Sequence, residues 1–138
     1  MLSSAGNNSL NIDKYPDVPV SFGGVVAIAS STQSSKLARH SNYGPKKVVF
    51  ASPGEKIYSA YTDSSFKIMT GTSMAVAVAS GTIGFLYAID LPERERSPKK
   101  ILEELCVGPT NYWKKYSRCG ELILSQAITK ILDYTPAN

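Results

Sequence analysis

The chain has 138 residues, of which 43% are hydrophobic and 19% are charged, and its formal net charge is +4. This length suffices for one domain with its own core, and the composition is that of a globular protein, which excludes fibrous and disordered classes. No run of about 20 apolar residues occurs, so we expect no membrane span. The first ten residues lack both a basic region and a long apolar segment, so we expect no signal peptide there.

Residues 1–72 are expected to form strands and loops. Residues 2–5 look like the end of a strand, which Gly6-Asn7-Asn8 would stop. The continuous apolar runs at 25–29 and 48–51 have strand length and suit a parallel sheet buried on both faces. Residues 57–61 and 65–69 flank Thr62-Asp63-Ser64, which we predict to be the turn of a hairpin.

Residues 73–90 are predicted to form a helix that is apolar nearly all round, and such a helix belongs in the centre of a protein. Three small residues in it, Ser80, Gly81 and Gly84, are expected to leave room for close packing against the sheet. Leu91-Pro92 should end this helix.

Two peripheral helices are predicted within residues 97–133. Ser97-Pro98 begins the first, with serine as the cap and proline at the first helical position, and residues 122–132 carry apolar residues at helical spacing. Strands followed by a buried helix and two outer helices indicate an α/β fold, with a parallel sheet flanked by helices.

Cys106 and Cys119 are the only cysteines, and their separation of 13 residues fits no zinc site. They could form one disulfide if the chain is extracellular, or remain two partly buried thiols. Between them, residues 112–116 alternate aromatic and basic side chains, a pattern also found in nucleic-acid-binding surfaces. We favour a solvated basic turn with aromatic anchors, and we expect no nucleic-acid partner.

The most informative motif is Gly71-Thr72-Ser73-Met74-Ala75, which stands at the start of the predicted central helix. Unpaired backbone N–H groups and the positive end of the helix dipole gather at such a position. They can hold the negative charge that develops when a serine attacks a carbonyl group. Ser73 could instead be a simple N-cap, a role in which serine is common.

Ordered segments of the chain resemble the subtilisin-like serine proteases (subtilases, peptidase S8 type) over about residues 2–133. The matching segments are Ser4-Ala5-Gly6-Asn7, Ser41-Asn42-Tyr43-Gly44, Ala51-Ser52-Pro53-Gly54, Gly71-Thr72-Ser73-Met74-Ala75, and Gly120 with Leu122 and Ala127. The pentad alone is moderately specific, whereas the ordered set is highly specific.

The resemblance implies a serine endopeptidase that hydrolyses polypeptide substrates through an acyl-enzyme at Ser73. The Ser73 backbone N–H and the Asn7 side-chain amide would form the oxyanion hole, supported by Gly6, Gly71 and Thr72. Asn7 could also be a plain turn residue, because Gly-Asn-Asn favours turns. A parent protease of this kind would be secreted or in the secretory pathway.

The single histidine, His40, is not expected to be catalytic. The subtilase triad runs Asp, His, Ser along the chain, so both partners should precede Asn7. Residues 1–138 are therefore interpreted as a single partial domain, the C-terminal half of a subtilase catalytic domain, which lacks the triad Asp and His and is expected to be inactive alone. Its partner would be the missing N-terminal half. A sheet cut at a central strand should make the isolated chain marginally stable or prone to association.

Two alternative functions are a binding module without catalysis and an α/β-hydrolase esterase. Val76-Ala77-Val78 stands where most subtilases have a proline, which favours the alternative of a pseudoprotease, or a module that binds a peptide or a partner. An α/β-hydrolase esterase is disfavoured, because Ala75 replaces the second glycine of its motif and no histidine follows Ser73. No cofactor is required.

A structural calcium ion is possible at the loop of residues 6–24 but is not indicated. Asn8, Asn11 and Asp13 could supply oxygen ligands, although nothing in their spacing demands a metal.

Overall fold

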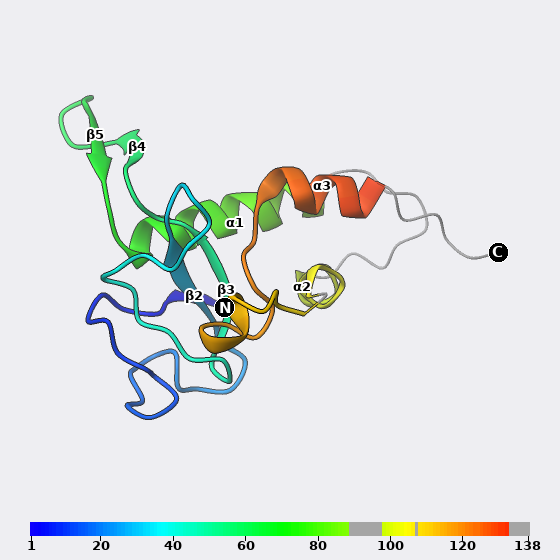
Figure 1. The fold of residues 1–138 in the computed structure, drawn as a ribbon. Coiled ribbons are helices and arrows are strands. Elements are labelled where there is room, and N and C mark those ends of the chain that lie inside the picture. Colours follow the sequence, from blue (N-terminus) through cyan, green and yellow to red (C-terminus); the bar gives the residue numbers. More distant parts are fainter. Residues whose placement is uncertain (89–97, 107, 133–138) are drawn as a thin grey trace.

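The computed structural model describes all residues except 89–97, 107 and 133–138 (Figure 1). Five strands precede the helices within this part of the chain. They are β1 (Leu2–Ser4), β2 (Val26–Ser31), β3 (Val48–Pro53), β4 (Ile57–Ala60) and β5 (Phe66–Met69). The helices are α1 (Thr72–Ala88), α2 (Pro98–Leu105), the 3₁₀ turn η1 (Trp113–Lys115) and α3 (Leu124–Leu132).

Strands β1, β2 and β3 form a parallel sheet in that spatial order, which confirms the predicted sheet. Leu2 pairs with Val26, and Ala27 pairs with Val48, with one irregularity in register after Ala27. All but the first residue of β2 and all but the last of β3 are buried. This burial on both faces explains why these strands are continuous apolar or small-residue runs rather than alternating patterns.

The two edges of this sheet differ. Along β3, the N–H groups of Arg118 and Cys119 donate to Val48 O and Val49 O, both at 2.8 Å, and Leu122 N–H donates to Ala51 O at 2.7 Å. Along the opposite edge, β1 pairs with β2 alone in the part of the chain that the structure describes. The sheet is therefore open on the β1 side.

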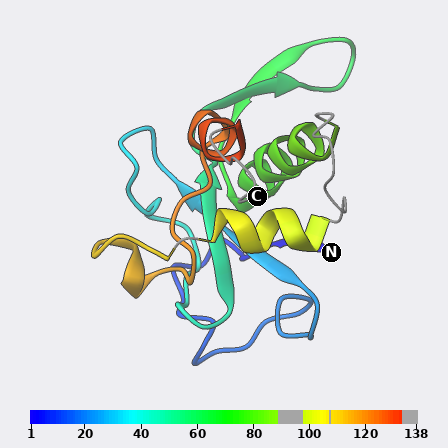
Figure 2. The same ribbon diagram turned by 90° about the vertical axis from the view of Figure 1, so that its right-hand side faces the viewer.

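Helix α1 lies across the sheet and contacts all three strands (Figure 1). Its buried apolar residues follow one helical stripe, and they pack on Ile28 and Phe50 of the sheet. This stripe consists of Ala75, Ala79, Ile83 and Leu86. Residues from α2 and α3 join the same core, so the three helices share one face of the sheet (Figure 2).

The opposite face of α1 is exposed, contrary to the expectation of burial all round. Ser80, Gly81 and Gly84 are exposed, and no atom lies within 4 Å of a Cβ built at either glycine, so the prediction that they pack against the sheet is wrong. Phe85 is 50% exposed on this side of the helix. Because α1 is apolar on every side, hydrophobic periodicity could not tell which face meets the sheet.

A second core lies beneath the other face of the sheet, where Ile12 and Trp113 pack against Ala27, Val48 and other strand residues. Trp113 is buried while Lys114 and Lys115 are exposed, as expected for a basic turn with aromatic anchors.

The two cysteines form a disulfide, with Cα atoms 4.8 Å apart, which resolves the alternatives left open by the sequence. It ties the end of α2 to the segment that borders β3. The expected helix stop at Leu91-Pro92 and the expected cap Ser97 lie outside the described residues. Among the helices that are described, none is long and apolar enough to cross a membrane.

The predicted hairpin is confirmed. Strands β4 and β5 pair antiparallel, and Tyr61 N–H donates to Ser65 O at 2.8 Å to close the turn around Asp63. The hairpin projects from the body of the molecule (Figure 1), and β5 leads directly into the loop before α1.

Candidate active site

Three segments that are distant in sequence meet at the N-terminus of α1, beside the carboxyl ends of the parallel strands. The loop after β1 arrives at Gly6, whose N–H donates to Thr72 Oγ1 at 3.2 Å. The loop after β3 arrives at Gly54, whose carbonyl accepts the Gly71 N–H at 2.9 Å. Ligands of open α/β sheets bind at this end of the strands.

Asn7 is held at this helix end by two hydrogen bonds to one oxygen. Its Oδ1 accepts the Thr72 backbone N–H at 2.9 Å and the Thr72 hydroxyl at 3.0 Å. These donors fix the amide orientation, because they can meet only the carbonyl end of the side chain. The Nδ2 end lies 3.6 Å from the position that a Cβ on Gly71 would occupy. Asn7 therefore presents an NH₂ group beside the loop that leads to Ser73.

Ser73 is exposed in the first turn of α1. The Thr72 N–H is bound by Asn7, and the N–H groups of Met74 and Ala75 donate to Gly71 O at 3.1 and 3.2 Å. Within the described residues, the Ser73 N–H has no hydrogen-bond partner and the Ser73 hydroxyl caps no backbone N–H. Asn7 supplies the capping oxygen instead, so the N-cap interpretation of Ser73 does not fit the structure.

A donor pair at the positive end of a helix is what an oxyanion requires. The Ser73 N–H has no hydrogen-bond partner in the described part of the chain, and the Asn7 NH₂ group is oriented by bonds to Oδ1 that leave its own hydrogens available. The Ser73 N–H belongs to the same residue as an exposed hydroxyl group, and the Asn7 NH₂ group lies beside the loop that leads to that residue. Such an arrangement can stabilise the charge that forms on a carbonyl oxygen under attack by Ser73.

Asn42 supports this site, and the sequence reasoning did not assign it that role. This buried side chain donates from Nδ2 to Ala5 O at 2.9 Å, and its Oδ1 accepts the N–H groups of Asn8 and Leu10, both at 2.9 Å. Its backbone N–H donates to Gly6 O at 2.9 Å. The side-chain amide of Asn42 thus holds the loop that carries Asn7 at three backbone positions. The only sequence signal was that Asn42 lies in a segment that resembles the family's turn.

The glycines at the site are required by close approach. Gly6 has φ = 101°, in a region that favours glycine, and a Cβ there would overlap Asn42 Nδ2. A Cβ on Gly54 would overlap Ser30 Oγ and lie 2.8 Å from Gly71 O and 2.9 Å from the Ala75 Cβ. These contacts bring β3 against the start of α1 and so help to place Ser73.

His40 lies in the loop before Asn42, where its carbonyl accepts the Ser9 N–H at 3.0 Å. Its Nε2 is buried and has no hydrogen-bond partner among the described residues, so no hydrogen bond joins it to Ser73.

Two of the three side chains considered for calcium, Asn11 and Asp13, have their oxygen atoms hydrogen-bonded within the protein. Asn11 Oδ1 accepts the Asp13 N–H at 3.0 Å, and the Asp13 carboxylate accepts the N–H groups of Lys46 and Lys47 at 3.0 and 2.9 Å. In the described residues, no group of three or more His, Cys, Asp or Glu side chains could hold a metal ion.

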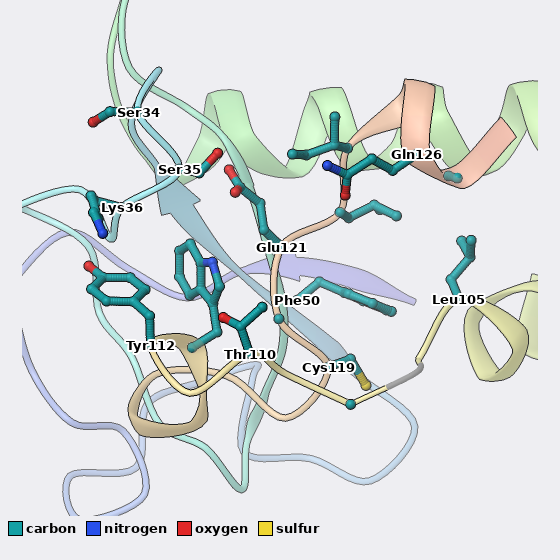
Figure 3. A pocket seen from close by; sticks show the side chains of 16 residues that line it. Ser34, Ser35, Lys36, Phe50, Leu105, Thr110, Tyr112, Cys119, Glu121 and Gln126 are labelled. Atoms are coloured by element: carbon teal, nitrogen blue, oxygen red, sulfur yellow. The ribbon is translucent and has the colours of Figure 1, made fainter. Parts of the chain in front are cut away.

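A separate cavity has a volume of about 430 Å³. Residues of β3, α2, α3 and the loop between β2 and β3 line it. Its lining includes Phe50, Leu105, Tyr112, Glu121 and Gln126 (Figure 3). None of Asn7, Thr72 and Ser73 lines it. The cavity is therefore distinct from the candidate active site.

Comparison with known proteins shows the family of the chain. The model of the subtilase family (peptidase S8) matches residues 1–105. A subtilisin-like protease of Coccidioides posadasii (strain C735) is 39% identical over 103 residues, which cover 75% of this chain and 25% of that protein. The chain thus spans about a quarter of the length of this curated relative.

Solved structures show the same fold. The prenylagaramide maturation protease PagA superposes with a TM-score of 0.76 at 25% identity, over 97% of this chain and 50% of that chain. The epidermin leader peptide processing serine protease from Staphylococcus aureus gives a TM-score of 0.79 at 22% identity, over 99% and 41%. The chain covers about half of these structures, as a partial domain would. This chain belongs to the subtilase family of serine proteases.

Proposed function

We propose that residues 1–138 supply the nucleophile and the oxyanion hole of a subtilisin-like serine endopeptidase. The observation that carries the proposal is the pair of hydrogen bonds from Thr72 to Asn7 Oδ1, at 2.9 and 3.0 Å, beside a Ser73 N–H that no described residue accepts. It leaves the Asn7 NH₂ group free for a ligand at the N-terminus of α1.

In the proposed reaction, Ser73 Oγ attacks the scissile carbonyl carbon of a polypeptide, and the carbonyl oxygen gains negative charge. Asn7 Nδ2 and the Ser73 N–H donate hydrogen bonds to that oxygen, and the dipole of α1 adds to their effect. Collapse of this intermediate expels the amine and leaves an acyl group on Ser73. Attack by water then releases the acid.

The general base and its carboxylate partner would come from outside residues 1–138. The one histidine of this sequence does not hydrogen-bond Ser73, and in subtilisin the triad Asp and His precede the Ser along the chain. A serine without a base is a weak nucleophile, so we expect residues 1–138 to be close to inert alone. The open β1 edge and the exposed face of α1 are where the completing segment would pack.

A binding module is the second candidate. The same open edge and exposed helix face could bind a partner without any catalysis, and Ala77 departs from the proline that most subtilases have there. The two candidates differ in whether Ser73 reacts.

The disulfide bears on the compartment. Disulfides persist mainly in oxidising environments, so the Cys106–Cys119 bond supports a parent protease that is secreted or in the secretory pathway.

The test uses the longest natural chain that contains residues 1–138, treated with a fluorophosphonate, which phosphonylates activated serines with loss of fluoride. We expect one label, located on Ser73 by mass spectrometry and lost in Ser73→Ala. Ser80→Ala is the matched control, because Ser80 is an exposed serine on the same helix. Hydrolysis of a casein substrate should follow the same pattern. A folded protein in which Ser73 stays unlabelled would favour the binding module.

A further inference from the structure

A cluster of cationic side chains lies at the amino end of the parallel sheet. Its members, which we call the basic cluster, are Lys46, Lys47, Lys114, Lys115 and Arg118. The first two directly precede β3, and the others belong to η1 or follow it. The Gly44 N–H donates to Tyr116 O at 2.9 Å, and the Arg118 N–H donates to Val48 O at 2.8 Å. These two bonds hold together two basic segments that are distant in sequence.

Positive charge exceeds negative charge in this region. All members of the basic cluster except the half-buried Lys47 are exposed, and none of the five forms an ion pair within the described residues. The Asp13 carboxylate lies against the cluster, where it accepts the backbone N–H groups of Lys46 and Lys47. Asp17 lies on the loop that Lys47 contacts through Ser21. Five cations against these two carboxylates leave a positive potential at this end of the molecule.

The basic cluster and the candidate active site lie at opposite ends of β3. Val48 begins the strand next to the cluster, whereas Gly54 follows the strand and accepts the Gly71 N–H. The strand has six residues and therefore spans about 20 Å. Figure 2 shows η1 and the start of β3 at the end of the sheet away from the β4–β5 hairpin. A ligand on the basic cluster therefore leaves Ser73 accessible.

The aromatic side chains beside these cations are not available for stacking. Trp113 is buried, and Tyr116 packs edge-on against Tyr43, with ring centroids 5.6 Å apart. The Tyr112 hydroxyl accepts the Leu37 N–H at 3.0 Å. Single-stranded nucleic acids bind through bases stacked on exposed aromatic rings as well as through charge. The basic cluster thus offers charge without a surface for base stacking.

The disulfide indicates which kind of polyanion the cluster meets. Bonds such as Cys106–Cys119 persist mainly outside the reducing compartments of the cell. Anionic phospholipids, by contrast, give their negative potential to the cytoplasmic leaflet of a membrane. Sulfated polysaccharides are polyanions of extracellular surfaces, and basic patches bind heparin, which is one of them. Their closely spaced sulfate groups complement a surface that carries several cations.

We propose that the basic cluster binds a sulfated polysaccharide and so attaches the protein to an extracellular surface while the candidate active site stays free. One exposed ion pair contributes little, but several cations on one polyanion act together and release its condensed counterions. Binding should therefore be tight at low salt and fall steeply as the salt concentration rises. The inference does not depend on catalysis by Ser73.

The test measures how the longest natural chain that contains residues 1–138 binds immobilised heparin over a range of salt concentrations. Lys114→Gln/Lys115→Gln removes two exposed cations from the basic cluster. We expect its dissociation constant to rise about 3- to 30-fold, the combined effect of two surface ion pairs. The dependence of binding on salt should become shallower, because fewer counterions are released. Lys114→Arg/Lys115→Arg keeps both charges and should bind as the wild type does.

Lys56→Gln/Lys67→Gln is the matched control, because it removes the same charge from two exposed lysines at the β4–β5 hairpin. It should keep the wild-type affinity within about twofold, since salt screens charges that lie so far from the cluster. Equal losses of affinity in the two Gln double variants would refute the location of the site.

Three other ligands test the class of the partner. We expect heparin to bind more tightly than desulfated heparin, a single-stranded oligonucleotide or phosphatidylserine vesicles at the same salt concentration. If the oligonucleotide or the vesicles bind as tightly as heparin, the assignment to a sulfated polysaccharide is wrong. Absence of heparin binding at low salt overturns the whole inference, and leaves the proposed chemistry of Ser73 untouched.

Discussion

The Thr72 hydroxyl is hydrogen-bonded to both Gly6 and Asn7 of the candidate active site. The substitution Thr72→Val tests how much this hydroxyl contributes to stability and to kcat. Valine replaces Oγ1 by a methyl group of similar size, so the packing of this fully buried side chain is retained. Two hydrogen bonds disappear, one to Asn7 Oδ1 at 3.0 Å and one from the Gly6 N–H at 3.2 Å. The backbone bond from Thr72 N–H to Asn7 Oδ1, at 2.9 Å, remains.

The expected loss of stability follows from these two bonds. Each net hydrogen bond contributes about 1 kcal/mol, and the Gly6 N–H is left facing a methyl group, so we expect a total loss of about 2–3 kcal/mol. The Asn7 amide keeps one of its two restraints. We therefore expect kcat to fall about tenfold, less than on deletion of the amide, with KM within about twofold.

Thr72→Ser is the matched control, since it keeps the hydroxyl and removes one methyl group at a cost of about 1 kcal/mol. Both variants would be made in the longest natural chain that contains residues 1–138, and compared by urea unfolding and by peptide hydrolysis. If Thr72→Val is as stable as Thr72→Ser and keeps the wild-type kcat, the hydroxyl does not orient Asn7 and the reasoning is refuted.

Three further predictions concern the support of the site. Asn42→Asp keeps the shape but loses the Nδ2 donor inside the core, so urea unfolding should show a loss of at least about 2 kcal/mol; an unchanged midpoint would argue against the amide network. Gly54→Ala should lower stability by about 1–3 kcal/mol through its backbone clash, whereas Gly81→Ala, which meets no atom within 4 Å, should raise the stability of isolated residues 1–138 by up to about 1 kcal/mol; equal effects would contradict the packing at α1. Cys106→Ser should cost about 3 kcal/mol, because the bond to Cys119 closes a short loop; reduction with dithiothreitol should then have no further effect on the variant.

Local patterns predicted much of the fold. Continuous apolar runs placed β2 and β3, and the turn residues around Asp63 placed the hairpin. The Gly-Thr-Ser-Met-Ala motif placed the start of α1 to within one residue. In each case the signal lies within a few consecutive residues, which is the range over which backbone preference and burial act together.

Contacts between distant segments could not be predicted from local patterns. Asn42 binds the loop at Ala5 across 37 residues, and such pairing is set by the assembled sheet rather than by neighbours in sequence. Residues 118–122 also form hydrogen bonds along β3, but their sequence lacks the alternation of apolar and polar residues that would predict a strand. The exposed face of α1 was missed for another reason, because a helix that is apolar all round gives no phase to its burial.

The central claim is that Asn7 Nδ2 and the Ser73 N–H bind the oxyanion, and kinetics of Asn7→Leu test it most directly. In the longest natural chain that contains residues 1–138, kcat for a peptide substrate should fall about 10²- to 10³-fold while KM changes little. This is the range established for the corresponding donor in subtilisin, which we carry over to this relative. A folded Asn7→Leu variant that retains wild-type kcat would contradict the account.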